Sequence, residues 1–163
     1  VKMSQNVAAE LPVLGQVLPS NEVHLKHALD LVLHTGSRNV AMIGLSFKGG
    51  TDDLRESPLL ELAERLIGKG IGIRIYDPEV NVARLIGSNR DFAAERIPHI
   101  ASIMSEDYEC LLDEAEVIIM GARDADVEAS ICKRNGAVPT LIDLTGLPEE
   151  VTRDCKDVIG VCW

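Results

Sequence analysis

Apolar and polar positions follow two alternating periods along the chain, which predict helices and strands in turn. Apolar residues with near-helical spacing predict an amphipathic helix that is capped at Ser20 and ends at Gly36. The same spacing predicts a second helix over 59–67, stopped by Gly68 and Gly70. Short runs rich in Val, Ile and Leu predict buried strands. These strands are expected at 39–47, 71–76, 117–120 and 140–144, the last of them closing the sheet.

Weaker patterns fill the intervals between these elements. A short helix is expected over 80–86, a third strand over 99–104, and further helices over 106–114 and 124–133. Strands that alternate with helices predict one α/β domain, a Rossmann-like doubly wound parallel sheet. We expect residues 1–20 to be a connector from a preceding helical or central region, and residues 21–163 to form the domain.

Composition limits the kinds of function. The 163 residues are 46% hydrophobic and 26% charged, which suits one soluble domain with a single core. A net charge of −10 argues against nucleic acid as a partner. No apolar run reaches the roughly 18 residues of a membrane span and no signal peptide opens the chain, so we expect no membrane contact and a cytoplasmic protein. The four cysteines lie far apart, which favours reduced, mostly buried thiols over a disulfide or a zinc site.

The segment from Gly44 to Pro58 joins the first strand to the next helix and carries two cations. Ser57 and Pro58 have the types preferred at the N-cap and first turn of a helix. Ligands of open parallel sheets gather at the carboxyl ends of the strands, where Lys48 and Arg55 fall. The segment therefore predicts a phosphate or pyrophosphate site, and the alternative is two solvated surface cations.

The same segment, Gly-Leu-Ser-Phe-Lys-Gly-Gly-Thr-Asp-Asp-Leu-Arg-Glu-Ser-Pro, resembles the C-terminal domain of the nucleotide-sugar 6-dehydrogenases, the family of UDP-glucose and GDP-mannose dehydrogenases. The resemblance covers nearly the whole chain and is weakest before residue 20. Four further segments look most like the GDP-mannose branch of the family: 59–66, 74–77, 97–99 and 162–163.

The resemblance implies an NAD-dependent oxidation of a sugar C6 alcohol to a carboxylate through a cysteine-bound intermediate. It implies that Lys48 contacts the nucleotide-sugar and that Arg55 contacts NAD, which is bound mainly by a separate N-terminal domain. Phe47 is expected either against the sugar nucleotide or in the core. The glycine fingerprint of a nicotinamide site and the family's catalytic-cysteine segment do not occur in these residues. We therefore expect no catalytic residue here, and partners in missing N-terminal and central domains and in a homo-oligomer.

Several alternatives remain open at this stage. The chain could be a stand-alone sugar-nucleotide-binding or oligomerisation module, or a domain of a UDP-glucose or UDP-N-acetylhexosamine dehydrogenase. A receiver domain would use Asp52, Asp53 and Asp77 around magnesium, but its acceptor and lysine are not evident. Asp77 fits a turn better than a ribose contact, and Asp53 fits loop capping better than acid–base work. His24 and His27 have the spacing of metal ligands, but a solvated helix face is more common, and no metal is expected.

Overall fold

The computed structural model describes residues 15–46, 53–80, 95–134, 139–153 and 155–161. These residues form a sheet of five parallel strands in the order β2-β1-β3-β4-β5. The strands are β1 (Asn39–Ile43), β2 (Gly72–Tyr76), β3 (Val117–Met120), β4 (Thr140–Asp143) and β5 (Val158–Gly160). The helices are α3 (Val17–His34), α4 (Pro58–Gly68), α6 (Ile100–Ile103), α7 (Tyr108–Glu114), α8 (Ala125–Lys133) and α9 (Glu149–Thr152).

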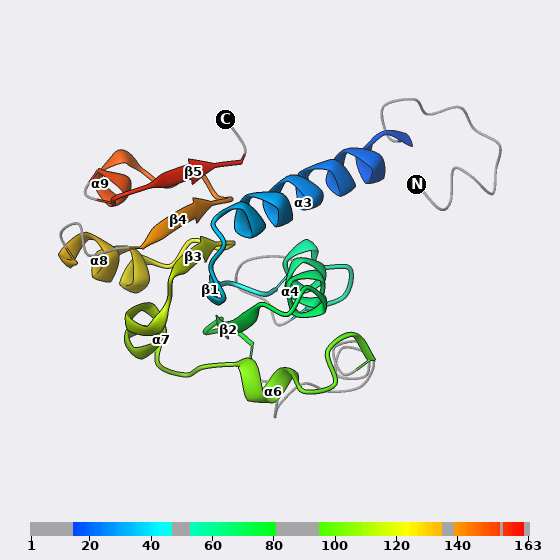
Figure 1. Ribbon diagram of the computed structural model, residues 1–163, viewed down its shortest axis with the longest axis horizontal. Coiled ribbons are helices and arrows are strands. Elements are labelled where there is room, and N and C mark those ends of the chain that lie inside the picture. The colour runs from blue at the N-terminus through cyan, green and yellow to red at the C-terminus, as the bar shows by residue number, and fades with distance from the viewer. Residues whose placement is uncertain (1–14, 47–52, 81–94, 135–138, 154, 162–163) are drawn as a thin grey trace.

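Helices cover both faces of the sheet (Figure 1). Successive strand side chains point to opposite faces, and each face has its own group of buried apolar residues. Val40 and Met42 of β1 belong to the core under α3 and α4, whereas Ala41 and Ile43 belong to the core under α7, α8 and α9. The predicted α/β class and doubly wound parallel sheet are therefore confirmed.

The strand order creates a switch point beside β1. The chain places β2 on one side of β1 and then crosses back to place β3 on the other side. The connection after β1 leads to α4 on one face and the connection after β3 leads to α8 on the other, which opens a crevice at the carboxyl ends of β1 and β3. In an open α/β sheet this crevice is the usual place for a ligand.

The first described helix begins earlier than the sequence suggests. α3 starts at Val17 with Gln16 as its N-cap residue, so the predicted cap at Ser20 is wrong. Ser20 lies within the helix, and its N–H donates to the Gln16 carbonyl at 2.9 Å. α3 therefore crosses residue 20, where the connector was expected to end.

Two strand predictions are wrong. Residues 99–104 contain the helix α6, and only Met104 makes a single parallel bridge to Ile75. The apolar residues Ile100, Ile103 and Met104 have the i, i+3, i+4 spacing of a helix, and this period outweighs the β-branched character of the two isoleucines. In addition, β4 does not close the sheet, because β5 pairs with it in parallel along the outer edge.

Other differences are smaller. β1 ends at Ile43 rather than at residue 47, and α7 begins at Tyr108. The helix expected over 80–86 lies almost entirely outside the described residues. Cys110 and Cys132 are free thiols as expected, but these two residues and Cys155 are half-buried rather than buried. Among the helices that the structure describes, none is both long and apolar enough to span a bilayer.

Candidate functional site

The turn that ends β1 depends on glycine. Gly44 has a φ of +91°, a conformation that side chains disfavour. A Cβ added to Gly44 would lie 2.4 Å from the Cβ of Ala122, which follows β3. Glycine thus lets the loops after β1 and β3 touch at the switch point.

Asp77 fixes the start of the loop that follows this turn. Its carboxylate is buried and accepts the N–H groups of Leu45 at 2.8 Å and Ser46 at 3.0 Å through Oδ2. Its Oδ1 accepts the N–H of Glu79 at 3.0 Å. The turn-forming role expected for Asp77 is confirmed, and the carboxylate also joins the end of β2 to the loop after β1.

Ser57 fixes the end of the same loop. It is the N-cap residue of α4, with Pro58 at the first helical position, as the sequence predicted. The buried Ser57 hydroxyl donates to the Leu45 carbonyl at 2.7 Å and accepts the N–H of Leu60 at 3.4 Å. Together with the buried side chains of Leu45 and Leu54, these bonds hold the two ends of the loop close to each other.

Arg55 lies within this loop and makes a bidentate pair with Asp53. Its Nε donates to Asp53 Oδ1 at 2.9 Å and its Nη2 to Oδ2 at 2.8 Å. Hydrogen bonds from the Arg55 side chain and backbone lower the pKa of Asp53 to about 2, so the carboxylate stays ionised at neutral pH. The Arg55 side chain is 55% exposed. Two of the five N–H donors of a guanidinium are used here, and the fork is held in one orientation.

The structure describes only some of the residues predicted for the site. It describes Arg55, and it places this cation after the carboxyl end of β1, as expected. Phe47 and Lys48 lie outside the described residues, as does Asp52. Asp53 and Asp77 are engaged with protein donors, which removes two of the three carboxylates that a receiver domain would need.

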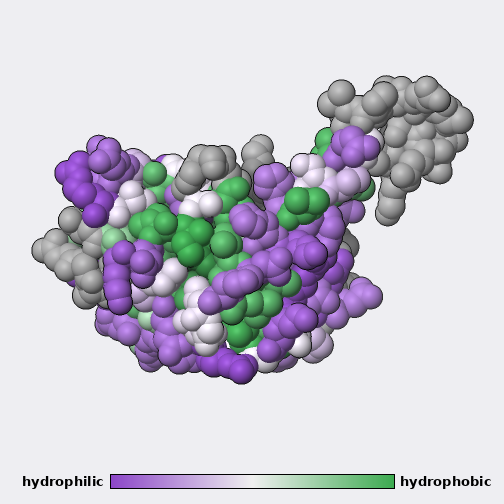
Figure 2. Space-filling view, turned by 45° about the horizontal axis from the view of Figure 1, so that its top comes forward, coloured by the Kyte–Doolittle hydropathy of each residue, from purple (hydrophilic) through white to green (hydrophobic). Residues whose placement is uncertain are grey.

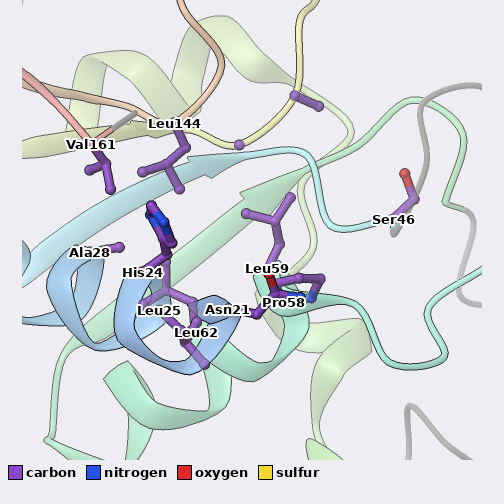
Figure 3. Close-up of a pocket in the computed structure, with 12 residues that line it drawn as sticks. Asn21, His24, Leu25, Ala28, Ser46, Pro58, Leu59, Leu62, Leu144 and Val161 are labelled. Atoms are coloured by element: carbon purple, nitrogen blue, oxygen red, sulfur yellow. The ribbon is translucent and has the colours of Figure 1, made fainter. Parts of the chain in front are cut away.

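A hollow of about 320 Å³ lies beside this loop, at the switch point (Figure 3). Its floor is formed where the strands end, by residues that follow β1, β3, β4 and β5. Its walls come from the middle of α3, from Asn21 to Ala28, and from the first turns of α4. The lining residues are Asn21, His24, Leu25, Ala28, Ser46, Pro58, Leu59, Leu62, Gly121, Ala122, Leu144 and Val161.

Sequence reasoning did not assign Asn21 and His24 to a site. His24 was expected on a solvated face together with His27, but only His24 lines the hollow. The described residues contain no group of three or more potential metal ligands. The signal that could have found this wall is the i, i+3, i+4, i+7 spacing of residues 21, 24, 25 and 28, which lie on one side of α3.

A further cation stands near the hollow and was also missed. Arg123 follows Ala122 after β3, and its side chain is 49% exposed. Its Nε donates to Glu128 Oε1 at 2.5 Å and its Nη2 to Oε2 at 2.7 Å. The loops after β1 and β3 therefore each present an arginine that is held by a carboxylate.

Comparison with known proteins identifies the class of protein that this fold and site define. Residues 41–150 match the model of the UDP binding domain of the UDP-glucose/GDP-mannose dehydrogenase family. The match spans the loop after β1, the switch point and most of the sheet. The chain belongs to this family.

Individual relatives show which members of the family the chain resembles. The chain is 39% identical to the GDP-mannose 6-dehydrogenase of Pseudomonas savastanoi pv. phaseolicola over 160 residues, which cover 98% of this chain and 36% of that protein. Its fold resembles the crystal structure of a ternary complex of GDP-mannose dehydrogenase from Pseudomonas aeruginosa, with a TM-score of 0.80, 35% identity, and coverage of 99% of this chain and 36% of that one. It also resembles the UDP-glucose dehydrogenase of Pyrobaculum islandicum, with a TM-score of 0.74, 25% identity, and coverage of 99% and 35%. The chain thus spans about a third of the length of these relatives.

Proposed function

We propose that this chain is the nucleotide-sugar-binding domain of an NAD-dependent dehydrogenase that oxidises the C6 alcohol of GDP-mannose to a carboxylate. The observation that carries the proposal is the 39% identity to a GDP-mannose 6-dehydrogenase along almost the entire chain. The 25% identity to a UDP-glucose dehydrogenase structure over a similar length makes a UDP-sugar the second choice of substrate. A site at the switch point, bordered by a loop that carries Arg55, is physically suited to a nucleotide.

The share of this domain in the reaction is positioning. In the proposed complex, Lys48 contacts the nucleotide-sugar, Phe47 borders it, and Arg55 contacts NAD. The bidentate pair with Asp53 supports the role of Arg55, because it fixes an exposed fork of donors that fits phosphate oxygens. NAD supplies the acceptor for hydride. A substrate that is fixed at its nucleotide end presents its C6 carbon in one place, which lowers the entropic part of the barrier.

The proposal includes partners for the domain. The catalytic cysteine and the main NAD site would lie in N-terminal and central domains of the same enzyme, with residues 1–20 as part of the connection. The intact enzyme would form a homo-oligomer and serve polysaccharide biosynthesis in the cytoplasm. The free thiols of Cys110 and Cys132 agree with that compartment.

Steady-state NAD reduction by the full-length protein tests the proposal. The substrates are GDP-mannose, UDP-glucose and UDP-N-acetylmannosamine, each varied at saturating NAD. We expect the highest kcat/KM with GDP-mannose. A higher kcat/KM with either UDP-sugar would make that UDP-sugar the substrate instead of GDP-mannose. No NAD reduction with any of the three would favour a binding or assembly module over a dehydrogenase.

Two variants test the roles of the cations. Lys48→Ala should raise the KM for the nucleotide-sugar and lower kcat, because a misplaced C6 carbon weakens an alignment made in the transition state. Arg55→Ala should mainly raise the KM for NAD. The loss of one charge-assisted contact corresponds to an increase of about ten- to a hundredfold in the KM of the ligand that it contacts. Equal effects on both ligands, or none, would make these residues scaffolding of the loop.

A further inference from the structure

One peptide unit of the loop after β1 is held from both sides. The N–H of Leu45 donates to Asp77 Oδ2 at 2.8 Å, and the Leu45 carbonyl accepts the Ser57 hydroxyl at 2.7 Å. Asp77 follows β2 and Ser57 caps α4, so the two partners belong to different elements. All three residues are buried, where water does not compete for these bonds. Leu45 therefore connects the end of β2 to the start of α4.

The turn that follows Arg55 has a strained backbone. Glu56 has a φ of +57°, in the left-handed region that residues other than glycine seldom adopt. Such a conformation persists where the surrounding structure determines it. On one side of the turn Leu54 is buried, and its carbonyl accepts the N–H of Ser57 at 3.2 Å. On the other side Ser57 is held by Leu45. The direction in which Arg55 leaves the loop is thus set by its neighbours.

We propose that Asp77 is a positioning residue that sets the place of Arg55 through these neighbours. The path consists of two hydrogen bonds, from the Leu45 N–H to the carboxylate and from the Ser57 hydroxyl to the Leu45 carbonyl. Three backbone N–H groups donate to the two Asp77 oxygens, so this carboxylate acts on the protein itself. The inference rests on the proposed function for NAD as the ligand of Arg55.

A second buried carboxylate separates positioning from plain stabilisation. Asp143 follows β4 and accepts the N–H groups of Thr145, Gly146 and Leu147. It holds the loop after β4 as Asp77 holds the loop after β1. Substitution of either carboxylate should lower the stability of the fold, but the bonds of Asp143 do not lead to the loop that carries Arg55.

A double-mutant cycle in the full-length enzyme tests the path, with the KM for NAD measured at saturating GDP-mannose. Asp77→Asn keeps the size of the side chain but replaces one acceptor oxygen by a donor. We expect this variant to raise the KM for NAD about three- to tenfold. Residues that act as one unit have non-additive effects, so Asp77→Asn should raise this KM much less in the Arg55→Ala background. An unchanged KM in Asp77→Asn, or effects that multiply in the double variant, would overturn the proposal.

Ser57 gives access to the same path with less risk to folding. Ser57→Ala removes the hydroxyl that donates to Leu45, whereas Ser57→Thr keeps a hydroxyl at this position. We expect the alanine variant to raise the KM for NAD about threefold, and the threonine variant to restore it to near the wild-type value. Equal KM values in the two variants would contradict a path through this hydroxyl.

Asp143→Asn is the matched control and should leave the KM for NAD unchanged. Urea unfolding of Asp77→Asn and Asp143→Asn gives the stability that each variant loses. A KM for NAD that rises in both variants, in proportion to the lost stability, would make Asp77 a structural residue and overturn its positioning role.

Amide hydrogen exchange separates this result from the proposed function, because it needs no turnover. We expect the amides of Arg55 and Ser57 to exchange faster in Asp77→Asn than in the wild-type protein, and at the wild-type rate in Asp143→Asn. This pattern in a protein that reduces no NAD would sink the dehydrogenase and keep the positioning role. NAD reduction with unaltered exchange and an unaltered KM in Asp77→Asn would sink the positioning role alone.

Discussion

At the scale of single residues, the pair between Arg55 and Asp53 orients a cation rather than stabilising the fold. Both side chains are largely exposed, with 55% and 40% of their side-chain surface accessible. Exposed ion pairs contribute little to the free energy of unfolding, because water screens them. Two short contacts to one carboxylate nevertheless restrict the guanidinium to one plane. We therefore expect the pair to affect ligand binding more than the free energy of unfolding.

Removal of Arg55 should be visible in the titration of Asp53. The wild-type pKa of about 2 should rise part of the way towards the ordinary value of about 3.9 in Arg55→Ala, because the side-chain hydrogen bonds that favour the carboxylate are lost while the backbone N–H of residue 55 still donates to it. Since the folded pKa is depressed, any stabilisation by the pair is present above pH 4 and is lost as the pH falls through 2. Carboxyl-carbon NMR measures this shift. Arg74→Ala, which removes a separate exposed pair with Glu114, should leave Asp53 unchanged. An unmoved Asp53 in Arg55→Ala would contradict the pairing.

At the scale of elements, the junction of β1 with its loop is the least tolerant part of the described site. Three features meet there: the φ of Gly44, the buried carboxylate of Asp77 and the capping hydroxyl of Ser57. The carboxylate and the hydroxyl supply partners to backbone groups that would otherwise be buried without one, and Gly44 allows the close approach to Ala122. The loop that carries Arg55 can present its cation because both of its ends are fixed.

Two glycine substitutions compare this junction with an ordinary helix end. Gly44→Ala should destabilise the chain by about 2–4 kcal/mol, because alanine would combine a disfavoured φ with a clash against Ala122. Gly68→Ala should be neutral or stabilise by up to about 1 kcal/mol, because nothing lies within 4 Å of its added Cβ. Urea unfolding of the 163-residue chain gives both values. Equal effects of the two substitutions would show that Gly44 is not under constraint.

The sequence predicted elements well where their period was clear. β2, α8 and the cap of α4 follow directly from apolar spacing and from Ser57 and Pro58. It failed where short runs were ambiguous, as at α6. It also missed β5, whose Val158 and Ile159 follow a charged stretch and offer too few residues for a period.

The candidate site was predictable only in part, for a physical reason. The cationic loop is continuous in sequence, so its cations could be identified directly. The hollow is assembled from six separate stretches of the chain, from Asn21 to Val161, and it exists only because the strand order brings them together. The strand order of the sheet cannot be predicted from any local pattern in the sequence.

At the scale of the whole molecule, the sheet joins two apolar cores into one unit. Alternate residues of β1, β3 and β4 contribute to the two cores, so the loss of any of these strands disrupts both cores at once. On the face drawn in Figure 2, apolar residues gather in the middle and hydrophilic residues surround them. Exposed large apolar side chains among the described residues occur at Val17, Leu18, Val23 and Val158, three of them in the first half of α3.

The 163-residue chain should therefore unfold in one cooperative transition. Shared strands couple the two cores, and a domain of this size normally unfolds as a unit. Calorimetry should give equal calorimetric and van't Hoff enthalpies. Two separate transitions, or a broad melt without a heat-absorption peak, would show that residues beyond this chain are needed to complete the core.

The attachment of α3 has a mechanical consequence. The helix is about 27 Å long, and from its middle onwards it is anchored in the core by Leu25, Leu29 and Val32. Nearer its start, Glu22 accepts two hydrogen bonds of 2.8 Å from Arg65 of α4. The turn before Glu22 projects from the body of the domain (Figure 1). Because Leu25, Leu29 and Val32 are buried in the core, a torque applied at Val17 should turn the sheet together with α3, and a hinge for this domain is expected upstream of Leu25.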